Sequence, residues 1–211
     1  MIIIGAKGFA KEILEILHQK GETENLCFYD DVNFELPEKL FGKFQILRNE
    51  EEAKKYFTEI DNKFVIGIGN PHLRKEMYEK FTDLGGKPHS LFSLKADFGS
   101  FDNIFEDGCI VTSGVIITNS VTIKKGAMIN ISSTIGHDTV IGEFVEICPN
   151  VSISGHCFIG NNVFVGTSAT ILPNITIGKN SIIAAGSIVT KNVPDNVMVA
   201  GIPAVIKKEL S

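Results

Sequence analysis

The chain has 211 residues, 44% of them hydrophobic and 21% charged, with a formal net charge of -5 at pH 7. These values are ordinary for a soluble globular protein and leave room for one large or two small domains. The acidic balance argues against nucleic acid or an anionic membrane as a partner, and no apolar run approaches the roughly 20 residues of a membrane span. Because the chain opens directly on a strand-like apolar segment, we expect no leader peptide and a cytoplasmic location.

Residues 1–92 are expected to form a small parallel α/β domain of Rossmann type. Apolar strands alternate with amphipathic helices, and ligands of such domains bind at the carboxyl ends of the strands. Asn70 is a candidate helix cap and is followed by proline at the first helical position. The expected elements, in chain order, are a strand at 2–4, a helix at 11–18, strands at 26–29 and 64–68, and a helix at 71–81.

A glycine turn, Gly5-x-x-Gly8, joins the first strand to the first helix. It lacks the GxGxxG spacing of dinucleotide-binding turns, so the turn by itself fits nucleotide binding or a purely structural role equally well. Residues 91–104 connect this domain to the rest of the chain. Their aromatic residues, together with Phe105, are expected to pack the first coil of the next domain against the α/β domain; they are Phe92, Phe98 and Phe101.

From residue 105 to residue 194 the chain repeats a six-residue unit fifteen times without an insertion. Such a period predicts a parallel β-helix, in which one unit forms one side of a coil and three units close a triangle. The first position of each unit is large and apolar and points inward, and the fifth is small or β-branched. The first positions are Phe105, Val111, Ile117, Ile123, Ile129, Ile135, Ile141, Ile147, Ile153, Ile159, Val165, Ile171, Ile177, Ile183 and Val189.

This β-helix is assigned to residues 93–211. Residues 195–211 are expected to cover its open end, with Lys207, Lys208 and Glu209 in a solvated tail. Four cysteines show no metal-ligand spacing and are interpreted as buried, reduced thiols; they are Cys27, Cys109, Cys148 and Cys157.

Residues eighteen apart stack on neighbouring coils, at a spacing of roughly 4.8 Å. His137 is therefore expected between Asn119 and Gly155, and Asp138 beneath His156. A carboxylate directly after a histidine can orient the imidazole for general-base work. A solvated side chain remains the simpler interpretation of any single histidine. A metal site at His137 and His156 is disfavoured because no third His or Cys is evident near them.

Three segments together resemble the bacterial sugar acetyltransferases of the sialic acid O-acetyltransferase and UDP-4-amino-sugar N-acetyltransferase family. They are residues 4–10 (IGAKGFA), 135–143 (IGHDTVIGE) and 199–204 (VAGIPA), and the resemblance extends over the whole chain. It implies a left-handed β-helix, a homotrimer, and acetyl-CoA in the cleft between neighbouring helices, with no metal.

The resemblance also implies roles for individual residues. The general base falls on His137, the acid that tunes it on Asp138, and the backbone amide at the thioester carbonyl on Gly155. The acetyl-CoA contacts fall on Glu146, which stands where a relative has histidine, and on Thr167 and Ala185. The nucleotide-sugar contacts fall on Lys7, Gly8, Phe9, Asp30, Asp31 and Gly69, with Phe9 replacing a histidine of several such enzymes.

We therefore expect an acetyl-CoA-dependent N-acetyltransferase acting on a nucleotide-linked amino sugar of the UDP-4-amino-4,6-dideoxy type, by direct transfer in a ternary complex. Acetylation of a hydroxyl on sialic acid or a related sugar is the main alternative. A β-helical metalloenzyme of the carbonic anhydrase type and a non-enzymatic nucleotide-binding scaffold are the others.

Overall fold

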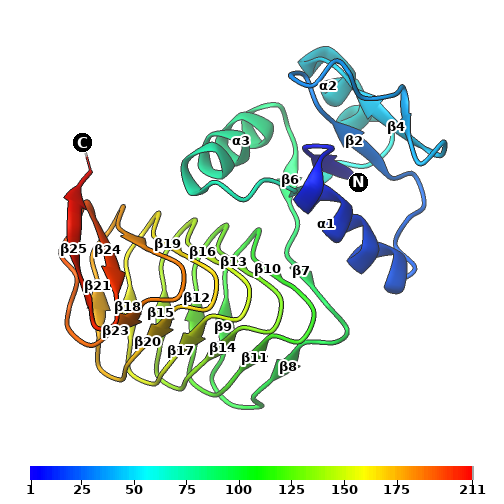
Figure 1. Ribbon diagram of the computed structural model, residues 1–211. Coiled ribbons are helices and arrows are strands. Elements are labelled where there is room, and N and C mark those ends of the chain that lie inside the picture. The colour runs from blue at the N-terminus through cyan, green and yellow to red at the C-terminus, as the bar shows by residue number, and fades with distance from the viewer. Residues whose placement is uncertain (211) are drawn as a thin grey trace.

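The computed structural model describes residues 1–210, which form an α/β domain and a long triangular prism of short strands (Figure 1). The α/β domain contains a six-stranded sheet with the order β3-β4-β2-β1-β5-β6. The strands pair in parallel except for the antiparallel β3 and β4. Their bounds are β1 Ile2–Ile4, β2 Cys27–Tyr29, β3 Lys39–Leu40, β4 Phe44–Leu47, β5 Lys63–Ile66 and β6 Lys87–Pro88.

Three helices cover the two faces of this sheet: α1 (Gly8–Gln19), α2 (Glu50–Glu59) and α3 (Pro71–Asp83). The residues of β1 alternate between the faces: Ile3 packs with α1, and Ile2 and Ile4 pack with α2 and α3. Asn70 caps α3 as expected, by accepting a hydrogen bond from the Leu73 N–H. Helix α1 begins at Gly8, earlier than the predicted residue 11, so the glycine turn and the helix N-terminus are one feature.

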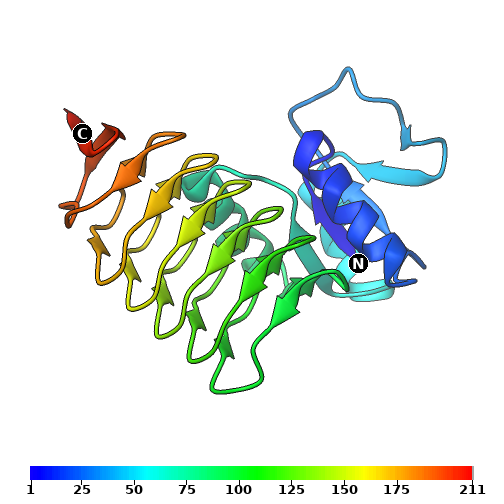
Figure 2. The same ribbon diagram turned by 60° about the horizontal axis from the view of Figure 1, so that its bottom comes forward.

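The prism consists of three sheets, one for each side of the triangle, whose strands pair in parallel except for β24 and β25. Figure 2 shows its successive coils. The first sheet, called here the covered face, contains β7 Leu91–Phe92, β10 Ile110–Val111, β13 Met128–Ile129, β16 Glu146–Ile147, β19 Phe164–Val165, β22 Ile182–Ile183, β24 Val197–Gly201 and β25 Ala204–Glu209. The second contains β8 Asp97–Phe98, β11 Ile116–Ile117, β14 Thr134–Ile135, β17 Ser152–Ile153, β20 Thr170–Ile171 and β23 Ile188–Val189. The third contains β9 Ile104–Phe105, β12 Thr122–Ile123, β15 Val140–Ile141, β18 Phe158–Ile159 and β21 Thr176–Ile177.

The six-residue period is confirmed by the register and burial of these strands. Thr134 pairs with Ser152, and Val140 pairs with Phe158, each eighteen residues on. The first position of every unit after Phe105 is at most 2% exposed, as is Ser133, a polar residue at the fifth position. Ser133 donates its hydroxyl to the Cys148 carbonyl, which removes the cost of burying it.

The interpretation of the four phenylalanines was wrong. Phe92, Phe98 and Phe105 pack edge to face on one another at the first end of the prism core, with ring centroids 5.2 to 5.8 Å apart. Phe101 is 69% exposed. The first coil itself supplies the contact with the α/β domain, because Leu91 belongs to the core beneath α1. The boundary between the sheet of the α/β domain and the sheets of the prism lies between β6 and β7. Strand β6 pairs with β5 of the α/β domain, and β7 pairs with β10 of the prism.

At the other end of the prism, β24 continues the covered face in parallel with β22, and β25 folds back on it in antiparallel pairing. Lys207, Lys208 and Glu209 are exposed to solvent as expected, but they belong to strand β25, so the expectation of a tail was wrong for them. Ser211, the last residue of the expected cap, lies outside the described residues. No helix within residues 1–210 has the length and apolar character that crossing a membrane requires.

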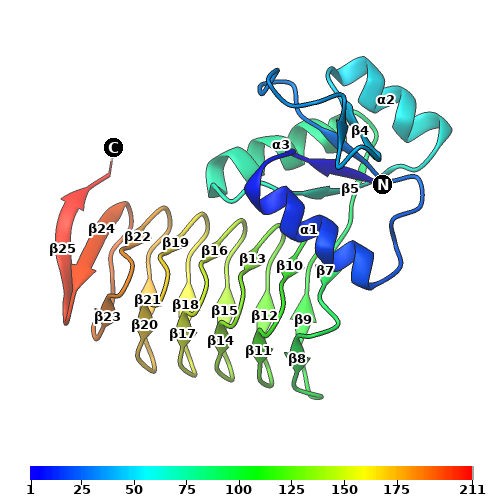
Figure 3. The ribbon, with the colours of Figure 1, turned by 45° about the vertical axis from the view of Figure 1, so that its right-hand side comes forward.

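The α/β domain sits on the covered face and on one edge of the prism (Figure 3). Ile110 and Met128 project from the covered face into the core beneath α1. Arg74 of α3 is fully buried and donates hydrogen bonds to the carbonyls of Gly126, Phe144 and Val145, which lie at the edge between the third sheet and the covered face. This contact fixes the orientation of α3 on the prism.

Candidate active site

A pocket of about 380 Å³ opens at the carboxyl ends of β1, β2 and β5. It lies where a parallel α/β sheet places its ligands. Its lining includes all six residues that were expected to contact the nucleotide sugar: Lys7, Gly8, Phe9, Asp30, Asp31 and Gly69. The sequence analysis missed Val32 and Asn33 after β2 and Leu73 and Met77 of α3. The position of Leu73 and Met77 at i and i+4 on a predicted helix was a signal that could have identified them.

The two acidic residues after β2 have different environments. Asp30 is 6% exposed and accepts hydrogen bonds from the backbone N–H groups of Ala6, Val32 and Asn33. Burial raises the pKa of Asp30, but hydrogen bonds, led by that from the Asn33 side chain, outweigh it and hold the pKa below its ordinary value. Asp30 therefore ties the glycine turn to the end of β2, which shapes this side of the pocket.

Asp31 and Lys7 stand further out at the pocket mouth. Asp31 accepts a 2.8 Å hydrogen bond from the Tyr29 hydroxyl and lies 3.5 Å from Lys80 Nζ. Lys7 Nζ pairs with Glu35 at 2.8 Å, and both side chains are exposed. Exposed pairs of this kind exchange partners at little cost, so Lys7 is free to meet a charged ligand.

The first turn of α1 faces the pocket with its backbone N–H groups. Among the residues that the structure describes, no side chain caps this helix, and no acidic residue lies in its first turn. The N-terminus of α1 is therefore a site of partial positive charge that favours an anionic ligand group. The close packing of this turn requires Gly67, because a Cβ there would lie 2.7 Å from Ala10.

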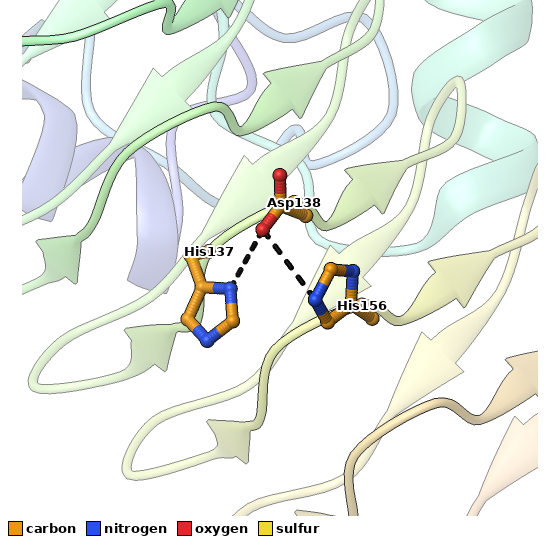
Figure 4. A group of neighbouring side chains, drawn as sticks. All are labelled: His137, Asp138 and His156. Carbon is orange, nitrogen blue, oxygen red and sulfur yellow. Dashed lines mark hydrogen bonds and ion pairs between the residues drawn. The ribbon is translucent and has the colours of Figure 1, made fainter.

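A second cluster of polar side chains lies on the prism edge between the second and third sheets, where β14 leads into β15 (Figure 4). His137 Nδ1 lies 2.7 Å from Asp138 Oδ2, and His156 Nε2, from the next coil, lies 3.6 Å from the same oxygen. The two imidazole rings are edge to face, with centroids 5.0 Å apart. Since Nδ1 of His137 faces the carboxylate, Nε2 is the nitrogen that is available to another molecule.

Gly155 lies directly against the His137 ring. A Cβ on this residue would come within 2.7 Å of His137 Nε2, so only glycine leaves the ring its place. Within residues 1–210, the Gly155 N–H has no hydrogen-bond acceptor. The edge thus combines an imidazole with a free nitrogen and an unpaired backbone donor one coil away.

The residues expected to contact acetyl-CoA fall in two places. Thr167 and Ala185 are exposed and stack on successive coils at the edge between the covered face and the second sheet, where the Gly186 N–H donates to the Thr167 carbonyl. Glu146 lies on the covered face and is 8% exposed. A Cβ on Gly69 would lie 2.9 Å from Glu146 Oε1, so the two residues are in close contact. Burial raises the pKa of Glu146, against the opposing effect of Arg74.

Cys148 is buried beside this site, and burial raises the pKa of its thiol to about 12. A thiol with so high a pKa is a poor nucleophile at neutral pH.

The side chains of the His137 cluster could also bind a metal ion. His137, Asp138 and His156 offer three potential ligand atoms that lie within 4.8 Å of one another. Asp138 is thus a third ligand that the sequence analysis, which considered only His and Cys, overlooked.

Within one chain, the pocket does not adjoin the prism edge that carries His137. The α/β domain lies on the covered face, whereas the edge between the second and third sheets is the one opposite that face in a triangular prism. None of the residues that line the 380 Å³ pocket belongs to the prism. The Thr167–Ala185 edge, in contrast, borders the covered face.

Comparison with known proteins identifies both parts of the chain. Residues 1–81 match the family model of the PglD N-terminal domain, and residues 156–191 match that of bacterial transferase hexapeptide repeats. A comparison with curated protein sequences finds no match.

Three solved structures are similar to nearly the whole chain. A point mutant of perosamine N-acetyltransferase from Caulobacter crescentus, in complex with CoA and GDP-perosamine, is 25% identical with a TM-score of 0.91, over 99% of this chain and 96% of that one. The acetyltransferase domain of PglB from Neisseria gonorrhoeae FA1090, in complex with acetyl coenzyme A, is 25% identical with a TM-score of 0.89, over 98% of each chain. WeeI from Acinetobacter baumannii AYE is 27% identical with a TM-score of 0.89, over 98% of each chain.

Fold and site together define the class of hexapeptide-repeat acyltransferases with a left-handed parallel β-helix. Within that class, residues 1–81 match the PglD N-terminal domain, and nearly the whole chain is similar to solved acetyltransferases, among them a perosamine N-acetyltransferase.

Proposed function

We propose that this protein transfers the acetyl group of acetyl-CoA to the amino group of a nucleotide-linked 4-amino sugar. The observation that carries the proposal is the arrangement at the prism edge, where the free Nε2 of His137 lies against Gly155, whose N–H has no acceptor within residues 1–210. The pocket at the N-terminus of α1 supports a phosphate-bearing acceptor. The amine is supported by the likeness to an N-acetyltransferase in complex with GDP-perosamine.

In the proposed reaction the sugar amine attacks the thioester carbonyl carbon directly. His137 Nε2 takes a proton from the amine nitrogen as the new C–N bond forms, and Asp138 holds the resulting imidazolium through Nδ1. The Gly155 N–H donates to the oxyanion of the tetrahedral intermediate. The C–S bond then breaks, and the CoA thiolate takes the proton from His137.

We propose that a homotrimer assembles the site from two chains. One chain supplies the sugar-nucleotide pocket and the Thr167–Ala185 edge, along which an extended pantetheine can lie, with Glu146 in the wall beneath Gly69. A neighbouring chain supplies His137, Asp138 and Gly155. Acetyl-CoA as substrate and four buried free thiols both fit a cytoplasmic protein.

The test is acetyl transfer from acetyl-CoA to a panel of UDP- and GDP-linked 4-amino-4,6-dideoxy sugars, other amino-sugar nucleotides, and free or CMP-linked sialic acid. We expect a product on a nucleotide-linked amino sugar that survives mild alkali, because an amide does and an ester does not. Acetylation confined to sialic acid and removed by alkali would overturn the amine assignment.

The same assay tests the alternative that His137, Asp138 and His156 bind a catalytic metal ion. We expect dialysis against EDTA to leave the rate of acetyl transfer unchanged, because proton transfer by the His137–Asp138 pair requires no metal ion. A loss of activity that Zn²⁺ restores would favour the metalloenzyme.

A further inference from the structure

His156 is a residue that the proposed mechanism does not use, yet it shares the carboxylate of Asp138 with His137. Its Nε2 lies 3.6 Å from Asp138 Oδ2, the same oxygen that faces His137 Nδ1 at 2.7 Å. All three side chains are about half exposed or more. A surface carboxylate with one partner keeps rotational freedom, whereas a second cationic or N–H partner on the same oxygen restricts it.

The backbone conformation at position 156 does not require histidine. His156 has a φ of 56°, in the left-handed region that asparagine adopts more readily than most residues. Asparagine does hold this conformation at other turns of the prism: Asn150, Asn162, Asn174, Asn180 and Asn196. Asn174 is the equivalent residue one coil further along the same edge, with a φ of 64°. The imidazole of His156 is therefore explained by what it contacts and not by the turn it occupies.

The contact depends on the stacking of two coils. The His156 N–H donates a 2.8 Å hydrogen bond to the His137 carbonyl, so the backbones of the two histidines are fixed relative to each other. The edge-to-face rings then leave Asp138 between them (Figure 4). Asparagine at position 156 would keep the turn but would be too short to reach Asp138 Oδ2.

We propose that His156 is a positioning residue for acetyl transfer: from the neighbouring coil it holds Asp138 in the orientation that keeps His137 Nε2 aimed at the acceptor. The inference rests on the proposed function. It assigns His156 no contact with substrate or with the reacting atoms, and its effect on the reaction passes through Asp138.

The experiment compares His156→Asn, which keeps the turn, with His156→Gln, whose side-chain amide can still donate to Asp138. We expect His156→Asn to lower kcat by about fivefold with both KM values unchanged, the size of effect expected from the loss of one exposed polar contact. His156→Gln should recover most of that loss. Asn174→Ser, at the equivalent position of the next coil, is the matched control and should have wild-type kcat and thermal stability.

A double-mutant cycle separates positioning from general structure. In an Asp138→Asn background, His156→Asn should change kcat by less than about twofold, because the group through which it acts is gone. The same fivefold loss in both backgrounds would overturn the proposal, as would wild-type kcat in His156→Asn.

A measurement without turnover keeps the test independent of the proposed function. The rate at which diethyl pyrocarbonate modifies His137, followed by peptide mass spectrometry, reports the reactivity of its free nitrogen. We expect this rate to fall severalfold in His156→Asn and to recover in His156→Gln. An unchanged rate would overturn the positioning role, and a wild-type protein that transfers no acetyl group would overturn the proposed function instead.

Discussion

His137 offers a single nitrogen to a substrate, because Asp138 occupies the other. We predict that His137→Ala lowers kcat by about 10² or more, the range for loss of a general base, and leaves acetyl-CoA affinity nearly intact. Asp138→Asn should cost less, since the imidazole remains. Steady-state kinetics and calorimetric binding of acetyl-CoA check both variants, and wild-type turnover in His137→Ala would remove this residue from the mechanism.

Asp30 makes the fold sensitive to acid. Its pKa is lowered in the folded protein, so the ionised carboxylate stabilises the fold above the unfolded value of about 3.9, and this stability is lost as the pH falls through the lower folded value. We predict that Asp30→Asn lowers the free energy of unfolding at pH 7 by about 2 kcal/mol. Urea unfolding between pH 7 and pH 3 should show the deficit shrinking below pH 4; a constant deficit would contradict this account.

The sequence placed the residues of the site more reliably than it described their environments. Stacking by eighteen put Gly155 next to His137 because the period fixes the position of every residue along the prism. Asp30 and Asp31 look alike in the sequence, but only Asp30 is enclosed by backbone donors. Those donors come from Ala6 and from the turn after β2, and turn geometry of this kind cannot be derived from a periodic pattern.

At the scale of elements, Arg74 of α3 is the main polar link between the two domains. Its guanidinium donates to the backbone carbonyls of Gly126, Phe144 and Val145 in the prism and to those of Ile68 and Gly69 in its own domain. We predict that Arg74→Met destabilises the protein by about 3 to 5 kcal/mol, because buried carbonyls lose their donor.

Differential scanning calorimetry tests this prediction and should show the α/β domain unfolding before the prism in Arg74→Met. The control is Lys75→Met on the same helix, whose partly exposed side chain pairs with Glu79 and, within residues 1–210, with no other acid. It should change the stability by less than about 0.5 kcal/mol. A single transition at the wild-type temperature in Arg74→Met would show that apolar contacts alone hold the domains together.

The elements themselves were predictable to different degrees. The β-helix follows from its period, and β1, β2, β5 and the two helices α1 and α3 follow from apolar patterning. Residues 32–63 received no assignment, although they contain β3, β4 and α2. The strands there have only 2 and 4 residues, too few for a periodic pattern, but Asn49 and Glu52 formed a recognisable capping signal for α2.

At the scale of the whole molecule, we predict a trimer by sedimentation, with an active site shared between chains. Mixed trimers give a sharp test. Gly8→Trp should fill the pocket, since Gly8 lines it and a Cβ at this position would have no other atom within 4 Å. His137→Ala removes the base.

Neither variant should be active alone. Trimers reassembled from equal amounts of both should recover about a quarter of the wild-type activity, because random mixing pairs an intact pocket with a neighbour's intact base in that share of sites. No recovery, with mixed trimers verified by mass spectrometry, would place the pocket and the base of one site in the same chain.

The eighteen-residue coil also limits how this enzyme can change in length. An insertion of six residues would move every later residue to the next side of the triangle, so His137 would leave its edge even though the apolar core stayed continuous. An insertion of eighteen residues between the docked α3 and His137 would return each residue to its own edge, displaced by one strand spacing of about 4.8 Å. The distance between the acceptor pocket and the base can therefore change only in steps of one coil. Related enzymes can fit longer or shorter acceptors by gaining or losing whole coils, or by remodelling the α/β domain.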